Sequence, residues 1–303
     1  DVNGQFFGWG VQPSAMLSDI KRRLRYGKEH QVTGFLARTD WEGVQDWTCF
    51  DNLNMVNLYA IAAYAENENT SEEEIYLRWL QGEHMLDERL SPGQLKTCVQ
   101  TVKEIMDETW PIVEKTNFVN GCLFSNDSCM HLTPEQFTFI GGTHHSLSEW
   151  DPEKKDALEM SVENIARIIE DKEEAHVKCE KLVDRVVAGN MGLTEDAYEK
   201  MKEHFEFMRW YVRGFRLTAR GYCFGRYVTE KNAADMLVEG KTANVLLEET
   251  IHEMEKYREG LLQTTFIKKY PFDAQLNPER VAFYTNSLKR MLAQGKKVEI
   301  VED

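Results

Sequence analysis

The sequence predicts a mainly α-helical protein that begins with a short stretch of alternating strands and helices. In the first sixty residues, short apolar or aromatic runs alternate with patterns of helical spacing. After residue 66, apolar residues recur every three or four positions almost to the end, which is typical of packed helices. The 303 residues are enough to bury a substantial core. The change of pattern between residues 66 and 90 predicts two domains, residues 1–82 and 83–303.

The expected opening is a β-α-β-α unit. Residues 4–10, GQFFGWG, form a short aromatic run ended by glycines, and residues 32–37, VTGFLA, form a near-continuous apolar run of strand length. Such runs are common in parallel strands that are covered on both faces. Residues 14–30 place apolar side chains on one helical face and basic side chains on the other, and a second helix begins near Asn52. The short connections imply parallel strands.

The rest of the chain predicts a bundle of five to six long helices. Each of four start signals is a capping residue or a proline that fits the first helical turn: Ser71 with Glu74, Ser91 with Pro92, Asp151 with Pro152, and Thr194. Pro111 is expected to kink or end the helix that starts at Ser91. Long helices are expected over 151–188, from Thr194 onward, over roughly 230–263, and over 278–293.

Bulk composition narrows the classes of function. Hydrophobic residues make up 42% and charged residues 29% of the chain, which is an ordinary globular balance. The net charge of −15 argues against binding of nucleic acid, which requires clustered Lys and Arg. No stretch approaches the roughly 20 apolar residues that span a bilayer, and residues 1–10 lack the pattern of a signal peptide. The six cysteines show no zinc-ligand spacing; Cys122 and Cys129 could close a small disulfide loop or stay reduced.

Charged and aromatic side chains follow the two expected strands. Arg38, Asp40, Trp41 and Glu42 come directly after the second run, and Trp9 lies at the end of the first. In an open parallel sheet or a (β/α)8 barrel, ligands bind at the loops that follow the strands. An indole face covers the apolar face of a sugar ring, while carboxylates and guanidinium groups bind its polar groups. These residues predict a wall of a sugar pocket, unless the tryptophans simply pack under helices and Asp40 caps a turn.

The order of these motifs resembles the end of the catalytic barrel of α-glucuronidases and related exo-acting glycoside hydrolases. The resemblance lies in NGQFFGWG, in GFLARTDW and in AENENTSEEEIYLRWL, and it covers residues 1 to about 80, roughly a quarter of the chain. In that family, the eighth strand ends in a loop with Arg, Asp and Trp, and an all-helical C-terminal domain follows. The sequence departs from the family pattern at residues 66–68, where Glu-Asn-Glu replaces the usual Trp-Asn-Pro.

The resemblance implies the last two β/α units of a (β/α)8 barrel followed by a bracing helical domain. It implies the C-terminal portion of a carbohydrate-active glycoside hydrolase that acts on terminal sugars, with the five loop residues above in the substrate pocket. It aligns Asp1 with a catalytic carboxylate of the family's seventh strand, Asp standing for Glu. The family's general acid lies on an earlier strand, so this chain alone should not catalyse hydrolysis.

The resemblance also sets the expected partners. It implies a carbohydrate substrate, no cofactor, no nucleic acid or membrane partner, and a helical domain that could form a homodimer. A periplasmic or secreted location would follow if the parent enzyme degrades glycans in a bacterium. The rival function is a non-catalytic helical module that binds a protein partner or scaffold through residues 152–227.

Three further stretches carry side chains that could serve either a binding function or a purely structural role. His144, His145, Glu149 and Asp151 could bind a metal or a ligand, or belong to an ordinary surface loop. His176 and Cys179 have the spacing of a metal pair but fall on an apolar helical stripe, which favours core packing. Residues 209–227 combine arginines with aromatics, as in single-strand nucleic-acid binders. The acidic chain favours instead that Arg213, Arg216 and Arg220 pair with the acidic neighbouring helices or line a subunit interface.

Overall fold

The protein is mainly α-helical, as the sequence predicts. The computed structural model describes residues 10–39, 48–119, 122–123, 161–231, 238, 240–265 and 276–299. Among these residues, the strands are the two-residue β1 (Phe118–Val119) and β2 (Cys122–Leu123), which pair antiparallel. The described chain is therefore built from helices, and β1 and β2 form only a short hairpin.

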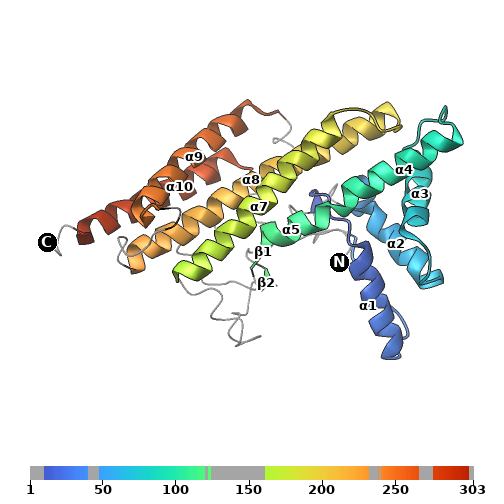
Figure 1. Cartoon of the computed structure of the whole chain (residues 1–303), viewed down its shortest axis with the longest axis horizontal. Coiled ribbons are helices and arrows are strands. Elements are labelled where there is room, and N and C mark those ends of the chain that lie inside the picture. Colours follow the sequence, from blue (N-terminus) through green and yellow to red (C-terminus); the bar gives the residue numbers. More distant parts are fainter. Residues whose placement is uncertain are drawn as a thin grey trace. The chain divides into compact units, whose positions relative to one another are not determined.

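The first part of the chain forms a series of neighbouring helices (Figure 1). They are α1 (Leu17–Glu29), the one-turn 3-10 helix η2 (Cys49–Asp51), α2 (Met55–Glu66), α3 (Glu72–Gly82), α4 (Pro92–Asp107) and α5 (Thr109–Asn117). Helix α2 contacts both α1 and α3, and α3 contacts α4. Helix α2 has almost no polar face, and Val56 and Ala60 are fully buried. An all-round apolar helix is buried in this way because it must be covered on several sides.

The predicted helix starts at Ser71 and Ser91 are confirmed, whereas the helix expected over 151–188 is seen only from Val162 to Val187 and does not include Ser161. The Ser71 hydroxyl accepts the backbone N–H of Glu74 at 3.2 Å and caps α3. Ser91 and Gln94 form a reciprocal capping box at the start of α4. Helix α4 ends at Asp107, and α5 resumes with Pro111 in its first turn, so the predicted interruption near this proline is confirmed.

The later part of the chain forms four longer helices: α7 (Val162–Val187), α8 (Glu195–Glu230), α9 (Ala243–Gln263) and α10 (Pro278–Glu299). The predicted apolar face of α8 is buried throughout, at Tyr198, Met201, Phe205, Met208, Val212 and Phe215. The helix expected over 230–263 is wrong in its first part, because α9 begins only at Ala243. Gly240 has φ 73°, and Val238 and Lys241 form a β-bridge just before α9. This tight turn is incompatible with helical backbone, since helix requires negative φ.

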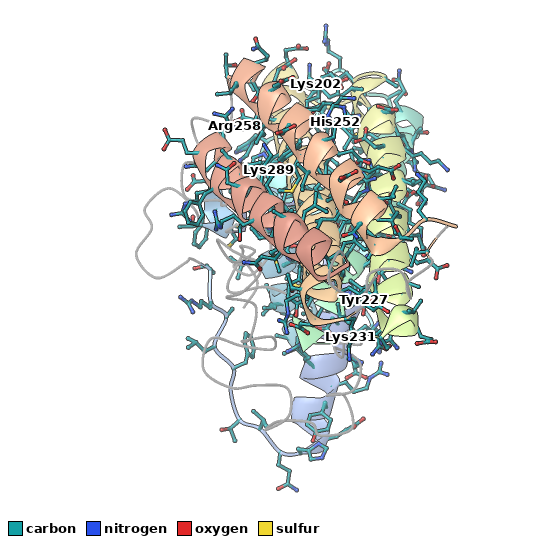
Figure 2. All side chains as sticks on the ribbon, turned by 90° about the vertical axis from the view of Figure 1, so that its left-hand side faces the viewer. Lys202, Tyr227, Lys231, His252, Arg258 and Lys289 are labelled. Carbon is teal, nitrogen blue, oxygen red and sulfur yellow. The ribbon has the colours of Figure 1, made fainter. Side chains whose placement is uncertain are left out.

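Helices α9 and α10 pack against each other (Figure 2). Lys289 of α10 donates to Glu255 of α9 at 2.6 Å, and Arg258 of α9 donates to the carbonyl oxygen of Pro278 at 3.0 Å. Helix α10 also lies close to α8, because a Cβ atom on Gly221 of α8 would come within 2.6 Å of Leu288. The absence of a side chain at Gly221 is what allows this close approach.

Residues 32–37 do not form the expected strand. The segment from Val32 to Thr39 has no regular secondary structure. The exposed fractions are 60% for Val32, 58% for Phe35 and 94% for Leu36. A strand needs a neighbour that pairs with its backbone. Within the described residues, no hydrogen bond joins residues 33–37 to any other segment. The barrel remnant is therefore not seen in the described chain; residues 4–9 of the other expected strand lie outside it.

The chain folds into two compact units. The first unit comprises Asp1–Val113 with Lys178–Arg209, and the second comprises Glu114–Val177 with Trp210–Asp303. The expected domain boundary at residue 82 rests on a change of sequence pattern and stays a prediction. Among the described helices, none has the length and apolar character that crossing a membrane requires.

Candidate functional site

Three buried asparagines around the start of α2 hold the chain that precedes α1. We call Asn52, Asn54 and Asn57 the asparagine brace. Asn52 donates from Nδ2 to the carbonyl oxygen of Gly10 at 2.8 Å. Asn54 donates from Nδ2 to the carbonyl oxygens of Gly10 at 2.9 Å and Gln12 at 3.1 Å. The brace thus fixes the backbone that follows Trp9.

The side-chain amides of Asn54 and Asn57 also form hydrogen bonds with the backbone of the next residues along the chain. The Oδ1 atom of Asn54 accepts the backbone N–H of Ser14 at 2.8 Å, and Oδ1 of Asn57 accepts that of Met16 at 2.8 Å. Asn57 also donates from Nδ2 to the carbonyl oxygen of Ser14 at 2.9 Å. The backbone before α1 lies outside any strand, so its buried polar groups need other partners. An amide side chain supplies both a donor and an acceptor, which explains the use of asparagine.

Asn52 also connects this segment to the predicted sugar-binding loop. Its Nδ2 atom donates to the carbonyl oxygen of Thr48 at 2.8 Å as well as to that of Gly10. The backbone N–H of Cys49 donates to the carbonyl oxygen of Thr39 at 2.8 Å. Asn52 therefore brings Gly10, which follows Trp9, next to the residues that flank the segment 40–47.

Most of the sequence-predicted site residues lie outside the described residues. This holds for Asp1, Trp9, Asp40, Trp41 and Glu42, whose assignment stays a prediction. The sixth, Arg38, is half-buried in the irregular segment after α1. The structure therefore brings together the flanks of the two predicted loops, at Gly10, Thr39 and Thr48.

One buried amide beside the brace has no partner. Gln12 is fully buried, and neither its Oε1 nor its Nε2 atom makes a hydrogen bond in the described part of the chain. A buried donor or acceptor that is left unsatisfied costs about 1–3 kcal/mol. Such groups are rare in native proteins and call for an explanation at the position where they occur. Gln12 thus adds an unpaired donor and acceptor directly beside the flanks of the predicted loops.

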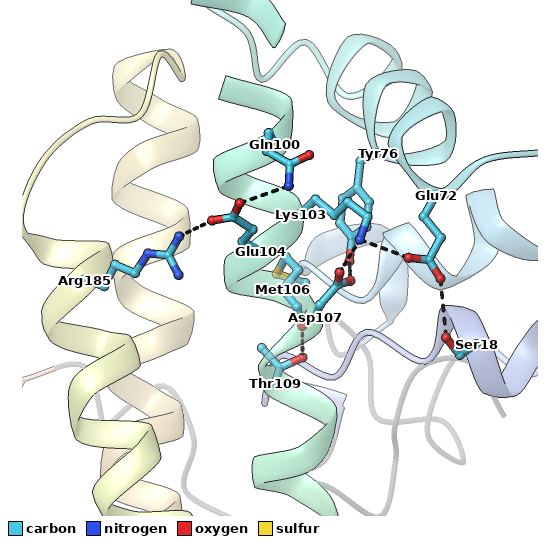
Figure 3. Close-up of polar contacts among 10 residues, drawn as sticks. All are labelled: Ser18, Glu72, Tyr76, Gln100, Lys103, Glu104, Met106, Asp107, Thr109 and Arg185. Atoms are coloured by element: carbon cyan, nitrogen blue, oxygen red, sulfur yellow. Dashed lines mark hydrogen bonds and ion pairs between the residues drawn. The ribbon is translucent and has the colours of Figure 1, made fainter. Parts of the chain in front are cut away.

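A second polar cluster joins α1, α3 and α4 (Figure 3). The ammonium group of Lys103 lies 3.0 Å from Glu72 and 2.5 Å from Asp107. The Tyr76 hydroxyl donates to Asp107 at 2.9 Å, and Ser18 donates to Glu72 at 3.4 Å. Burial by itself would lower the pKa of Lys103, but hydrogen bonds with Asp107 and Glu72 raise it above its ordinary value. The lysine stays charged, so the cluster braces three helices and is unsuited to proton transfer near neutral pH.

Lys172 of α7 is a buried amine with a structural role. Its Nζ donates to the carbonyl oxygens of Lys115 at 2.7 Å and Phe118 at 2.6 Å. The Lys115 carbonyl belongs to the last turn of α5, where helical carbonyl groups lack intrahelical partners, and Phe118 begins β1 directly after this helix. Burial lowers the pKa of Lys172 to about 7. The side chain therefore caps a helix C-terminus while titrating near neutral pH.

The structure shows the surroundings of the His176–Cys179 pair and the partners of two arginines on α8. On α7, Cys179 is buried and His176 is half-buried, which agrees with core packing. Arg216 pairs with Glu173 and Glu253, and Arg220 pairs with Glu173, so these two arginines pair with neighbouring helices as expected.

Arg213 binds aromatic rings, whereas the two arginines after it bind carboxylates. Its guanidinium carbon lies 5.8 Å from the ring centroids of both Trp210 and Tyr257. This placement is a cation–π contact within the second unit, which draws on the negative face of each ring. Arg213 therefore contacts the neighbouring helix α9 through the ring of Tyr257, where the sequence favours pairing with acidic side chains.

The histidine pair and the suggested disulfide stay predictions. His144, His145, Glu149 and Asp151 lie outside the described residues, as does Cys129. The four cysteines at 49, 98, 179 and 223 are free and buried. Burial raises the pKa of the Cys98 thiol to about 11, so this thiol is not a reactive nucleophile.

Sequence reasoning missed the asparagine brace. The spacing NLNMVN at 52–57 indicates the start of a helix, which is correct, but two of its asparagines lie before the first turn of α2. Their partners lie about 40 residues earlier in the chain, and helical pattern carries no information on such contacts. Comparison with known proteins supplies no further guide, because no family model, curated protein or solved structure matches this chain.

Proposed function

We propose that this chain is the C-terminal portion of a carbohydrate-active glycoside hydrolase that acts on terminal sugars. In this proposal, the loops around Trp9 and at Arg38, Asp40, Trp41 and Glu42 line one side of the sugar pocket. Trp41 covers the apolar face of the sugar, while the arginine and the acids bind its polar groups. Asp1 is the candidate for a catalytic carboxylate, and the remaining machinery belongs to the rest of the parent enzyme.

One observation carries most of the support. Asn52 binds the carbonyl oxygens of both Gly10 and Thr48, so one buried side chain ties together the flanks of both predicted loops. Two loops that act on one ligand need such a shared support, because catalytic and binding groups must be held within a fraction of an ångström. Core packing of the tryptophans would not require that the two flanks meet.

The exposed segment after α1 supports the barrel part of the proposal. Val32, Phe35 and Leu36 are strand-type residues with most of their side-chain surface open. The backbone of residues 33–37 makes no hydrogen bond in the described chain. An apolar segment whose backbone is open can become a sheet edge once further strands pair with it. In the proposal, other strands of the parent barrel cover this edge, and the helical region braces the barrel from outside.

The rival function, a helical module for protein partners, has less support. Arg216 and Arg220 are two of the cations within residues 152–227, and both pair with acids of this chain. Arg220 is itself buried. The hydrolase is therefore the main proposal, and it includes a homodimer formed through the helices.

Variants of the loop test the proposal in the full-length parent enzyme. Trp41→Ala and Asp40→Asn should each lower kcat/KM on an aryl glycoside substrate by at least about tenfold, which corresponds to ~1.4 kcal/mol of transition-state stabilisation. Phe50→Ala is the matched control, because Phe50 is 53% exposed and follows the loop without being part of it. Equal kcat/KM values for the loop variants and the control would contradict the proposal.

A further inference from the structure

A groove of about 510 Å³ lies within the first unit, beside α1 and the segment that follows it. The chain after α1 turns back along that helix, so that residues 21–28 and 32–35 line the same groove (Figure 1). Residues 64–68, at the end of α2, line it as well. Its volume is in the range of clefts that bind ligands.

The apolar side chains at this groove are open to a partner. Val32 exposes 60% and Phe35 58% of its surface, and Leu24 of α1 is half-buried. Leu36, which directly follows Phe35, exposes 94%. The backbone of residues 33–37 makes no hydrogen bond in the described part of the chain. The segment therefore offers apolar surface together with unpaired backbone groups, which are the two features that an added extended segment uses.

The charge of α1 and the segment after it is opposite to that of the whole chain. Residues 17–38 hold six Lys or Arg and two Asp or Glu, whereas the chain has a net charge of −15. More cations than acids line the groove: the cations are Lys21, Arg23, Arg25 and Lys28, and the acids are Glu66 and Glu68. The groove thus carries an excess of positive charge beside its open apolar surface.

Three of these cations share one face of α1 and repel one another. Arg25 is four residues from Lys21 and three residues from Lys28, and like charges at these spacings destabilise a helix. The helix macrodipole favours cations in the last turn, which accounts for Lys28 and not for Lys21. An acidic partner would relieve this repulsion, so charge complementarity points to a partner with carboxylates.

The shape of the groove favours an extended segment as that partner. Alternate side chains of an extended chain lie on opposite faces. Carboxylates on one face would meet the cations of α1, while apolar side chains on the other face would cover Leu36, which is not among the residues that line the groove. A membrane surface is flat, so it would reach the open Leu36 and would not enter the groove.

We propose that this groove binds an extended acidic segment of the parent enzyme, which pairs with the backbone of residues 33–37 and places carboxylates against Lys21, Arg25 and Lys28. The assignment of the segment to the parent enzyme rests on the proposed function, whereas the open apolar residues and the positive charge do not depend on it. The segment that covers residues 33–37 is thereby given a definite chemistry.

The test measures the binding of synthetic peptides to the 303-residue chain by fluorescence polarisation at physiological ionic strength. The probe is a short peptide that alternates valine and glutamate, and it should bind with a dissociation constant below about 100 µM. A peptide that alternates valine and lysine should bind at least tenfold more weakly, because its charge is wrong. The valine–glutamate peptide with an N-methylated backbone should also lose at least tenfold, because it lacks the donors that pair with residues 33–37.

Arg25→Glu and Arg22→Glu form a matched pair of variants. Both make the same change of charge on the same helix, but Arg25 lines the groove and Arg22 does not. Arg25→Glu should weaken binding of the acidic peptide at least tenfold and slightly raise the midpoint of thermal unfolding, because the new carboxylate lies one turn from Lys21 and Lys28. Arg22→Glu should leave binding within about threefold, since salt screens charges beyond about 8 Å.

The parent enzyme itself tests the source of the segment. The full-length protein should bind the valine–glutamate peptide at least tenfold more weakly than the 303-residue chain, because its own segment fills the groove. Equal binding by the two proteins would contradict this source.

Three other results would overturn the proposal. They are no binding of the valine–glutamate peptide at millimolar concentration, equal binding of the valine–lysine peptide, and unchanged binding in Arg25→Glu. Binding of phosphatidylserine vesicles without binding of the peptide would assign the surface to a membrane instead.

The outcome is separable from the proposed function, because peptide binding and hydrolysis are measured independently. A chain that binds the acidic peptide, together with a parent enzyme that hydrolyses no glycoside, would support the groove and refute the hydrolase. Hydrolysis by the parent enzyme without peptide binding by the chain would support the hydrolase and refute the groove.

Discussion

At the scale of single residues, Lys172 shows how burial and capping act on one side chain. Its ammonium group is taken out of water, which disfavours the charged form, while two carbonyl oxygens in and just after the last turn of α5 accept its hydrogen bonds. The pKa of about 7 lies below the ordinary value of 10.5. Between these values, the unfolded chain binds more protons than the folded protein.

This difference predicts a pH dependence of stability. Between pH 7 and 9, the free energy of unfolding should rise with pH by on the order of 1 kcal/mol per unit through Lys172 alone. The contribution is fully present above pH 10.5 and is lost as the pH falls to 7. The contribution of Lys172 to the free energy of unfolding is measured by chemical denaturation of the wild type and of Lys172→Met at several pH values. An unchanged difference between the two proteins across this range would contradict the low pKa.

The unpaired amide of Gln12 predicts an unusual response to mutation. Gln12→Met keeps the size of the side chain but removes two polar atoms that have no partner in the described chain. Stability should therefore rise, by about 1 kcal/mol. Tyr64→Phe is the matched control, because the buried Tyr64 hydroxyl also lacks a hydrogen-bond partner there. Destabilisation by Gln12→Met alone, measured by denaturant unfolding, would show that the amide is satisfied after all.

At the scale of elements, local signals predict the helix starts well. The caps at Ser71 and Ser91 and the break near Pro111 depend on residues within one turn, and such information is present in the sequence. The boundary between α8 and α9 escapes sequence reasoning because the apolar pattern runs on through Gly240, whose positive φ decides the turn. A single glycine is a weak signal within a helical pattern.

The strand expected over 32–37 is absent for a different physical reason. The composition of VTGFLA favours a strand, but a strand forms only when another backbone pairs with it, and that depends on contacts between distant segments. The candidate site likewise combines features that local sequence suggests with features that depend on contacts between distant segments. Loop residues such as Arg38 and Trp41 are proposed from residue type and position and stay predictions, whereas the asparagine brace depends on contacts across 40 residues.

At the scale of the whole molecule, the chain combines well-packed helices with an apolar segment that is left open. Helices α8, α9 and α10 bury a dense aromatic and aliphatic core, including Phe215 and Tyr257. In contrast, Leu36 exposes 94% of its surface in a chain with a net charge of −15. Within the described chain, the segment from Val32 to Leu36 thus combines apolar composition with open side chains, in contrast to the packed helices.

The most direct test of this account is hydrolysis by the full-length parent enzyme. A panel of aryl glycosides that includes a glucuronide should yield release of the aryl alcohol from at least one member, while residues 1–303 alone should release none. No release from any member of the panel by the folded full-length protein would contradict the central claim.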